Sequence, residues 1–174
     1  LGRAASFDGI DDLVDFTPSS TTGNFSFSLW VKPRSTHEID GEAVGGTVGT
    51  SGQKYVVYPR REGADSGAGL SVGTNGASVY EHGDSYLPAL LSYTTLIDDW
   101  TFLTVVYINN RSFLYVNGVF EKQGVQGPRI VHSPMETIGG GNYGHFYGLV
   151  DDFKIYDFSL SSEEILQEYD DTKL

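Results

Sequence analysis

The chain has 174 residues, 39% of them apolar, so it is long enough to bury a core and too apolar to be disordered. It contains no cysteine, which excludes disulfides, zinc–thiolate sites and thiol nucleophiles. Its 23 acidic residues outnumber 11 Lys and Arg, and the net charge of −12 argues against nucleic acid or an anionic membrane surface as a partner. The longest nearly apolar stretch, residues 102–108, is too short to cross a bilayer.

The clearest strand is predicted over residues 25–33, where apolar side chains alternate with Ser26, Ser28, Trp30 and Lys32. Trp30 therefore falls on the polar face of this strand, which indicates either packing against a further layer or a ligand groove. Shorter strands are predicted at residues 54–59, 69–73, 77–82, 100–108, 111–117, 119–123 and 148–157.

Turns and one helix complete the pattern. The pairs Asn75-Gly76 and Asn117-Gly118 predict two-residue hairpin turns, because a type I′ turn needs positive φ at both positions. A single short helix is predicted near the C-terminus, where Ser161 and Glu164 have the spacing of a capping box. These elements predict an all-β, antiparallel two-sheet sandwich with one short C-terminal helix, in which residues 1–174 form one domain.

Five segments resemble, in order, parts of a known family. Ala5-Ser-Phe-Asp-Gly-Ile-Asp-Asp-Leu-Val14 resembles the opening of laminin-G-like, concanavalin A-like jelly-roll domains, and Phe27-Ser-Leu-Trp-Val-Lys-Pro33 resembles one of their strands. Trp100-Thr-Phe-Leu-Thr-Val-Val-Tyr107 with Leu114-Tyr-Val-Asn-Gly118 resembles their central strands, and Gly148-Leu-Val-Asp-Asp-Phe-Lys-Ile-Tyr156 their last strand. The matches extend from residue 4 to residue 166.

This resemblance implies a jelly-roll sandwich whose first and last strands pair. It also implies a secreted or cell-surface setting, usually as a module beside a catalytic or adhesive domain. Because the chain starts at Leu1 without an initiator Met, we expect it to be a domain cut from a longer protein, and a monomer when isolated. Members of the family bind glycans, proteins or nothing yet identified, so function has to be argued from sites.

Five carboxylates suggest a structural calcium ion. Asp8, Asp11 and Asp12 lie in the opening turn, and Asp151 and Asp152 lie in the closing strand. If these strands pair, the carboxylates converge, and oxygen ligands of this kind suit Ca²⁺. The apolar residues two apart on the last strand also predict an inward Asp151, at the point where related glucanases have a calcium-binding Asp. The ligands expected are Asp8, Asp12, Asp151 and Asp152. In the alternative interpretation, Asp8 and Asp12 accept turn amides while Asp11 and Asp152 are solvated.

A carbohydrate site needs flat aromatic faces together with planar polar groups that bind hydroxyls. Two stretches and one Gly-rich loop supply both kinds of group, although Tyr is common on any β surface and Arg60 could simply pair with nearby acids. The predicted ligand-binding residues are Tyr58, Arg60, Arg61, Tyr80, His82, Tyr86, Tyr143 and His145.

No pair of carboxylates has the alternating spacing that the glucanases of this architecture use, and Glu81 stands alone on its strand. We therefore expect no catalysis. Two functions remain open. The first is a carbohydrate-binding, lectin-like module that recognises a glycan or polysaccharide beside neighbouring domains of its parent protein. The second is a protein-binding or spacer domain of an adhesin, with no sugar site.

Overall fold

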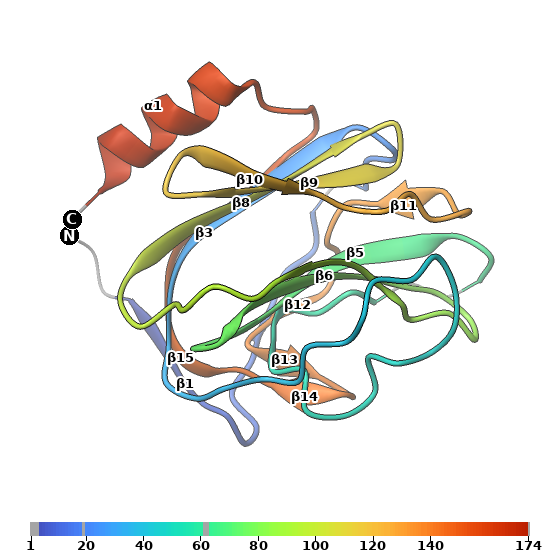
Figure 1. The fold of residues 1–174 in the computed structure, drawn as a ribbon. Helices are drawn as coiled ribbons and strands as arrows, with labels where there is room; N and C mark the ends of the chain where they lie inside the picture. The colour runs from blue at the N-terminus through green and yellow to red at the C-terminus, as the bar shows by residue number, and fades with distance from the viewer. Residues whose placement is uncertain (1–3, 19, 61–62, 174) are drawn as a thin grey trace.

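Two antiparallel sheets stack face to face and enclose the main apolar core (Figure 1). The computed structural model describes residues 4–18, 20–60 and 63–173. The first sheet has the order β1-β15-β3-β8-β9-β10. Its strands are β1 (Ala5–Asp8), β3 (Phe25–Pro33), β8 (Thr101–Ile108), β9 (Arg111–Val116), β10 (Val119–Gln123) and β15 (Tyr147–Tyr156). The pairing of β1 with β15 confirms the predicted contact of the first and last strands.

The second sheet has the order β2-β12-β4-β5-β6-β7, with β11 added alongside β5. Its strands are β2 (Val14–Asp15), β4 (Tyr55–Val57), β5 (Ser66–Gly73), β6 (Gly76–His82), β7 (Ala89–Tyr93), β11 (Val131–His132) and β12 (Thr137–Ile138). A separate small hairpin pairs β13 (Gly140–Gly141) with β14 (Gly144–His145). In Figure 1 this hairpin lies at the end of the molecule opposite the helix.

The alternating pattern of β3 places its side chains as predicted. Phe25, Phe27, Leu29 and Val31 are fully buried in the core between the sheets. The opposite phase, which includes Trp30, forms the outer face of the first sheet.

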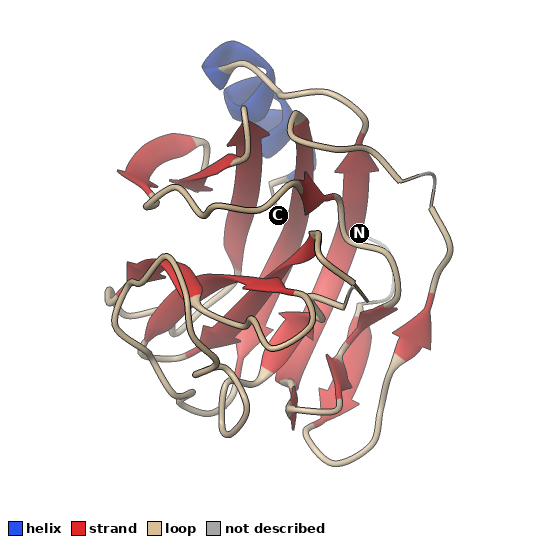
Figure 2. Ribbon diagram, turned by 90° about the vertical axis from the view of Figure 1, so that its right-hand side faces the viewer, coloured by secondary structure: helices blue, strands red, loops and turns tan. Residues whose placement is uncertain are grey.

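Helix α1 (Ser162–Thr172) covers that outer face (Figure 2). The predicted capping box is present, because Ser161 Oγ accepts the Glu164 amide and the Glu164 side chain accepts the Ser161 amide. Trp30 is 5% exposed; its ring packs 5.7 Å from that of Tyr169 and its Nε1 donates to Thr172 Oγ1 over 2.9 Å. Within the described ranges, no helix has the length and apolar character of a membrane span.

One turn and one strand differ from the prediction. The hairpin between β5 and β6 turns through Thr74 and Asn75, not through Asn75 and Gly76, and Asn75 has no positive φ. Its side-chain amide is hydrogen-bonded to the backbone of His37. The Asn117-Gly118 turn does have positive φ at both positions, as expected.

The last strand, β15, changes phase in its middle. Asp152 has φ 49° and the register against β3 shifts between Asp151 and Lys154, so this is a β-bulge. Before the bulge Val150 packs into the core, and after it Phe153 and Ile155 do. Asp151 therefore lies on the outer phase opposite Trp30, and the expected inward orientation is wrong because the bulge resets the alternation.

Candidate functional site

Three of the predicted ligand-binding rings meet beside the β13–β14 hairpin. Tyr58 directly follows β4, His82 ends β6, and Tyr143 lies in the turn between β13 and β14. The ring centroids are 6.1 Å apart for Tyr58 and His82, 5.6 Å for His82 and Tyr143, and 6.3 Å for Tyr58 and Tyr143. We call these three residues the aromatic cluster. His82 and Tyr143 are half-buried, whereas Tyr58 is 2% exposed.

Glycine brings the hairpin close enough to form this cluster. A Cβ at Gly141 would collide with the ring of Tyr58, so the backbone of β13 lies directly against that ring. The Gly-rich run that was predicted as a turn thus fixes Tyr143 over Tyr58 and His82.

Two polar atoms of the aromatic cluster are buried without a hydrogen-bond partner: Tyr58 Oη and His82 Nδ1. Burial raises the pKa of Tyr58 to about 12, and burial followed by the nearby Arg60 lowers the pKa of His82. Both side chains are therefore neutral near pH 7. A buried polar group left unpaired costs about 1–3 kcal/mol, so these atoms favour a ligand that hydrogen-bonds them.

An ion pair lies near the cluster. Arg60 Nη1 and Glu136 Oε1 are 2.8 Å apart, with side chains 44% and 36% exposed. Sequence reasoning anticipated that Arg60 could pair with an acid but did not find Glu136, because the two residues are far apart in the chain. An exposed pair of this kind adds little stability.

The other predicted ligand-binding residues add no exposed ring to the aromatic cluster, although Tyr80 packs in the same buried group as Tyr58 and Tyr143. Tyr80 is fully buried and donates from its hydroxyl to Asp40 Oδ2 over 2.6 Å, and Tyr86 is 4% exposed and donates to Glu81. Neither ring presents a face to a ligand. His145 pairs with Gly140 across the small hairpin, and Arg61 lies outside the described residues.

Glu81 faces the opposite way from its neighbours Tyr80 and His82. Its carboxylate is fully buried and accepts hydrogen bonds from Tyr86 (3.2 Å), Tyr107 (3.4 Å) and Ser66 (3.5 Å). Burial raises its pKa to about 7. The group lies within the protein, away from the aromatic cluster.

The carboxylates expected to bind calcium form two groups. Asp8, Asp11 and Asp12 are exposed and offer oxygens within 4.8 Å of one another. Asp8 Oδ1 accepts the Ile10 amide and Asp12 Oδ2 accepts the Asp8 amide, as the alternative interpretation expected.

The second group lies farther along β15. Asp8 pairs with Tyr147, four positions before Asp151, which at the strand rise separates the two backbones by about 13 Å. Asp151 and the exposed Asp152 are therefore not beside the opening turn, and the expected convergence of all five carboxylates is wrong.

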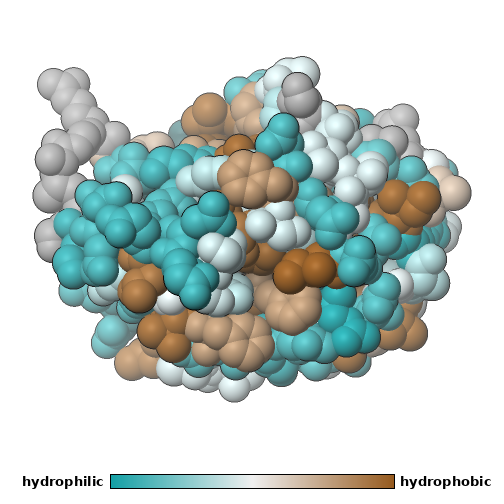
Figure 3. Space-filling view, turned by 90° about the horizontal axis from the view of Figure 1, so that it is seen from above, coloured by the Kyte–Doolittle hydropathy of each residue, from teal (hydrophilic) through white to brown (hydrophobic). Residues whose placement is uncertain are grey.

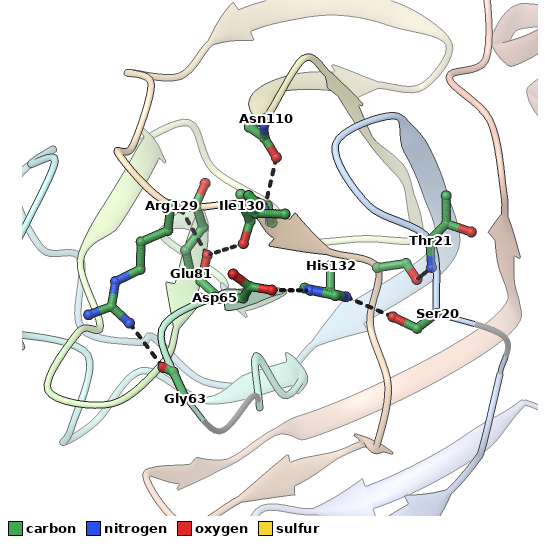
Figure 4. A network of polar contacts seen from close by, with 12 residues as sticks. Ser20, Thr21, Gly63, Asp65, Glu81, Asn110, Arg129, Ile130 and His132 are labelled. Atoms are coloured by element: carbon green, nitrogen blue, oxygen red, sulfur yellow. Dashed lines mark hydrogen bonds and ion pairs between the residues drawn. The ribbon is translucent and has the colours of Figure 1, made fainter.

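A hydrogen-bonded chain of Ser20, His132 and Asp65 went unnoticed in the sequence (Figure 4). Ser20 Oγ lies 2.8 Å from His132 Nδ1, and Asp65 Oδ2 lies 2.9 Å from His132 Nε2. The order of groups resembles that of a serine hydrolase, but the amide of Thr21 is used by Ser133 Oγ and so does not form an oxyanion site. The chain joins the segment before β3 to β5 and β11.

The fold is a two-sheet β-sandwich, and the aromatic cluster lies where β4 and β6 end, beside the β13–β14 hairpin. A family model described as the concanavalin A-like lectin/glucanases superfamily matches residues 8–166. The chain belongs to this superfamily, as the sequence resemblance indicated. Among curated proteins, no sequence matches the chain.

Solved structures share this fold at low sequence identity. Domain 4 of AbnA, an extracellular arabinanase from Geobacillus stearothermophilus in complex with arabinotriose, is 18% identical with a TM-score of 0.55, over 95% of this chain and 81% of that one. The botulinum neurotoxin serotype D binding domain is 17% identical with a TM-score of 0.65, over 95% of this chain and 41% of that one. The serotype D ligand-binding domain in complex with N-acetylneuraminic acid is 18% identical with a TM-score of 0.60, over 92% and 39%. The chain thus spans about two fifths of each of these two neurotoxin chains.

Proposed function

We propose that this chain is a non-catalytic carbohydrate-binding module, and that the aromatic cluster with Arg60 and Glu136 is its sugar site. The observation that carries the proposal is the partly exposed ring of Tyr143, which contacts two side chains with buried, unpartnered atoms, Tyr58 Oη and His82 Nδ1. A pyranose or furanose ring stacks its apolar side on an aromatic face while its hydroxyls reach such atoms. The arabinotriose and N-acetylneuraminic acid complexes of two neighbours in fold support a sugar as the ligand class.

The electrostatics of the site favour a neutral saccharide. Both unpartnered groups are neutral near pH 7, and Arg60 is already balanced by Glu136. The protein's net charge of −12 also disfavours a polyanion. Stacking on one ring with a few hydrogen bonds gives a Kd of roughly 10⁻³–10⁻⁵ M. Such affinity becomes useful when the sites repeat along a polymer or act beside a neighbouring domain.

Three observations support a binding role without catalysis. Glu81 lies inside the protein, where its carboxylate is bound to three hydroxyls. Glu136, a carboxylate near the aromatic cluster, is engaged by Arg60. Retaining glycosidases need two carboxyls about 5 Å apart at the sugar, and this site offers no such pair among its described residues. A secreted or cell-surface module that is monomeric and lies beside other domains is part of the same proposal.

A glycan array followed by calorimetry on the isolated chain tests the function. We expect binding to a neutral polysaccharide, with Tyr143→Ala and Arg60→Ala each weakening it tenfold or more. Tyr115→Ala, a half-buried Tyr on the outer face of the first sheet, is the matched control and should bind as the wild type does. Equal binding by all three variants would place the sugar elsewhere. If no glycan binds, the chain is a protein-binding or spacer domain.

Calcium remains a separate proposal at the opening turn. The three exposed carboxylates of Asp8, Asp11 and Asp12 fit a hard cation in donor type and spacing. When bound, the ion would neutralise their mutual repulsion and stabilise the turn. Asp151 and Asp152 are not included, because the register of β1 and β15 separates them from Asp8.

A further inference from the structure

Three hollows follow one another around the start of α1, on the face opposite the aromatic cluster. The largest, about 600 Å³, lies between α1 and the chain that leaves β15, and is lined by Tyr156, Phe158 and Glu163 among others. A second, about 340 Å³, lies on the other side of α1 and shares Glu163. A third, about 290 Å³, shares Tyr156 and Phe158 with the first. The first and third hollows adjoin at Tyr156 and Phe158, and the second lies across the start of α1, where Glu163 stands between it and the first. We call the three hollows and the helix start between them the α1 groove.

The groove has an apolar lining that water reaches. Phe158 is 48% exposed, and on the other side of the helix Val119, Phe120 and Leu166 are 58%, 50% and 47% exposed. Figure 3 looks down on this side of the molecule, where hydrophobic residues lie among hydrophilic ones. Apolar side chains that cluster in a groove mark an interaction surface more often than single exposed ones do.

The walls of the groove are acidic. Helix α1 carries Glu163, Glu164, Glu168, Asp170 and Asp171 and no basic residue. Asp170 is paired with Lys173 just past the helix, and Asp171 accepts a hydrogen bond from the neutral Gln167. Among the described residues, no cation is paired with Glu163 or Asp171, and these two uncompensated charges beside the hollows point to a positively charged occupant.

Glu168 is a buried acceptor in the wall of the largest hollow. Its side chain is 10% exposed, and its Oε1 accepts hydrogen bonds from Ser28, Lys154 and Tyr156. Its Oε2 is buried and has no partner. Lys154, the basic residue that lines this hollow, is already paired with Glu168, so the exposed carboxylates along the groove are not neutralised by it.

We propose that the α1 groove is a docking surface for a basic, extended segment of a partner protein, in which Lys or Arg alternates with apolar side chains. The chain of hollows fits an extended segment, since the apolar side chains enter next to Phe158 and Leu166 and the cations face Glu163 and Asp171. This surface is separate from the proposed sugar site, so one module can hold a glycan and a protein at the same time.

The probe is a ten-residue peptide of alternating Lys and Leu, titrated into ¹⁵N-labelled protein and followed by NMR. We expect shift changes confined to the amides around Phe158, Glu163 and Leu166. The double variant Glu163→Lys/Asp171→Lys should bind at least tenfold more weakly, with an unchanged far-UV CD spectrum. Asp11→Lys/Asp12→Lys makes the same change of charge in the opening turn and should alter Kd by less than twofold.

Control peptides define the chemistry. Replacing every Lys by Glu, or every Leu by Ser, should abolish binding. The proposal is overturned if the Lys/Leu peptide does not bind, if its shifts spread over the whole surface, or if both double variants weaken it equally, since general attraction to an acidic protein would then explain it. It is also overturned if a soluble glycan shifts these amides, or if sedimentation shows that the groove is occupied by a second copy of the chain.

Discussion

The outer faces of the two sheets both carry aromatic side chains, but different elements cover them. On the first sheet, α1 covers Trp30, supplies the Tyr169 ring and accepts its indole hydrogen bond. On the second sheet, Tyr80 is covered by the loop that contains Asp40, whereas His82, two residues farther along β6, and Tyr143 stay partly open. Helix α1 buries Trp30 with an aromatic ring and a hydrogen bond, whereas the loop around Asp40 buries only the side chain that it contacts, Tyr80.

This difference assigns the two faces different roles. Trp30 holds the layers together, and its position on the polar phase of β3 reflects packing against the helix. In the aromatic cluster Tyr58 is packed in a buried group with Tyr55 and Tyr80, but the cluster leaves two polar atoms unpaired.

The largest effect is expected from Trp30→Ala. Removing a buried Trp typically lowers the free energy of unfolding by about 3–5 kcal/mol. For a chain of this size that lowers Tm by on the order of 10 °C. Trp30→Phe keeps the stacking on Tyr169 and loses the hydrogen bond to Thr172, so it should lose about 1 kcal/mol. If Trp30→Ala melts like the wild type, α1 does not hold this face closed.

The interior between the faces is probed by Glu81→Gln and pH. Burial raises the Glu81 pKa to about 7 from 4.5, so the folded state binds a proton more tightly than the unfolded state. Its stabilising contribution is complete below about pH 4.5 and is lost as pH rises through 7, by about 3 kcal/mol in all. In urea unfolding, the free energy of unfolding of the wild type should fall by about this much between pH 5 and pH 8, whereas that of Glu81→Gln should not show this fall. The exposed control Glu121→Gln should follow the wild type, and an identical course for both variants would contradict the shift.

The proposed calcium site in the opening turn, next to β1, is tested by adding the ion. A ligand that binds only the folded state at a hundredfold excess over Kd stabilises it by about 2.7 kcal/mol. We expect Tm to rise by about 5–10 °C on adding Ca²⁺ to metal-free protein. Asp8→Asn should abolish this rise, whereas Asp151→Asn, on the other side of the register, should leave it intact. Superimposed curves with and without calcium would rule out the ion.

A smaller effect is expected at the start of the helix. Ser161→Ala removes the side chain that accepts the Glu164 amide, and loss of such a cap costs about 1 kcal/mol. Hydrogen exchange should become faster in α1 before it does in β3. Ser162→Ala, one residue later, is the control, and equal exchange in both variants would mean that the cap does not limit opening.

The smallest effect on stability is expected from Arg60→Ala. Exposed ion pairs contribute about 0–1 kcal/mol, so Tm should hardly change while glycan binding falls. A large loss of stability with unchanged binding would assign Arg60 to the scaffold of the second face.

The sequence was a sound guide to the fold where alternation was regular. The four apolar residues of β3 and the Ser161–Glu164 box lie as predicted, because strand period and capping are local. The site was only partly predictable. Tyr58, His82 and Tyr143 were found as aromatics near strand ends, but the burial of Tyr80 depends on a distant, irregular loop around Asp40 that has no periodic signal.

The error over Asp151 has a related cause. Strict alternation along the last strand predicts an inward carboxylate, and a single positive-φ residue, Asp152, cancels that prediction. Asp tolerates this conformation better than most residues do, but an Asp pair is too common to reveal a bulge in a single sequence.

The bulge at Asp152 gives β15 one residue more than its partner β3, because three residues lead from Asp151 to Lys154 where two lead from Trp30 to Ser28. Deleting this one residue would restore simple alternation without changing the phase, so Phe153 and Ile155 would still face the core and Lys154 and Tyr156 would still reach Glu168. Related sequences should therefore tolerate the loss of this residue better than a β-branched residue in its place, since β-branched side chains disfavour the φ of 49° found here.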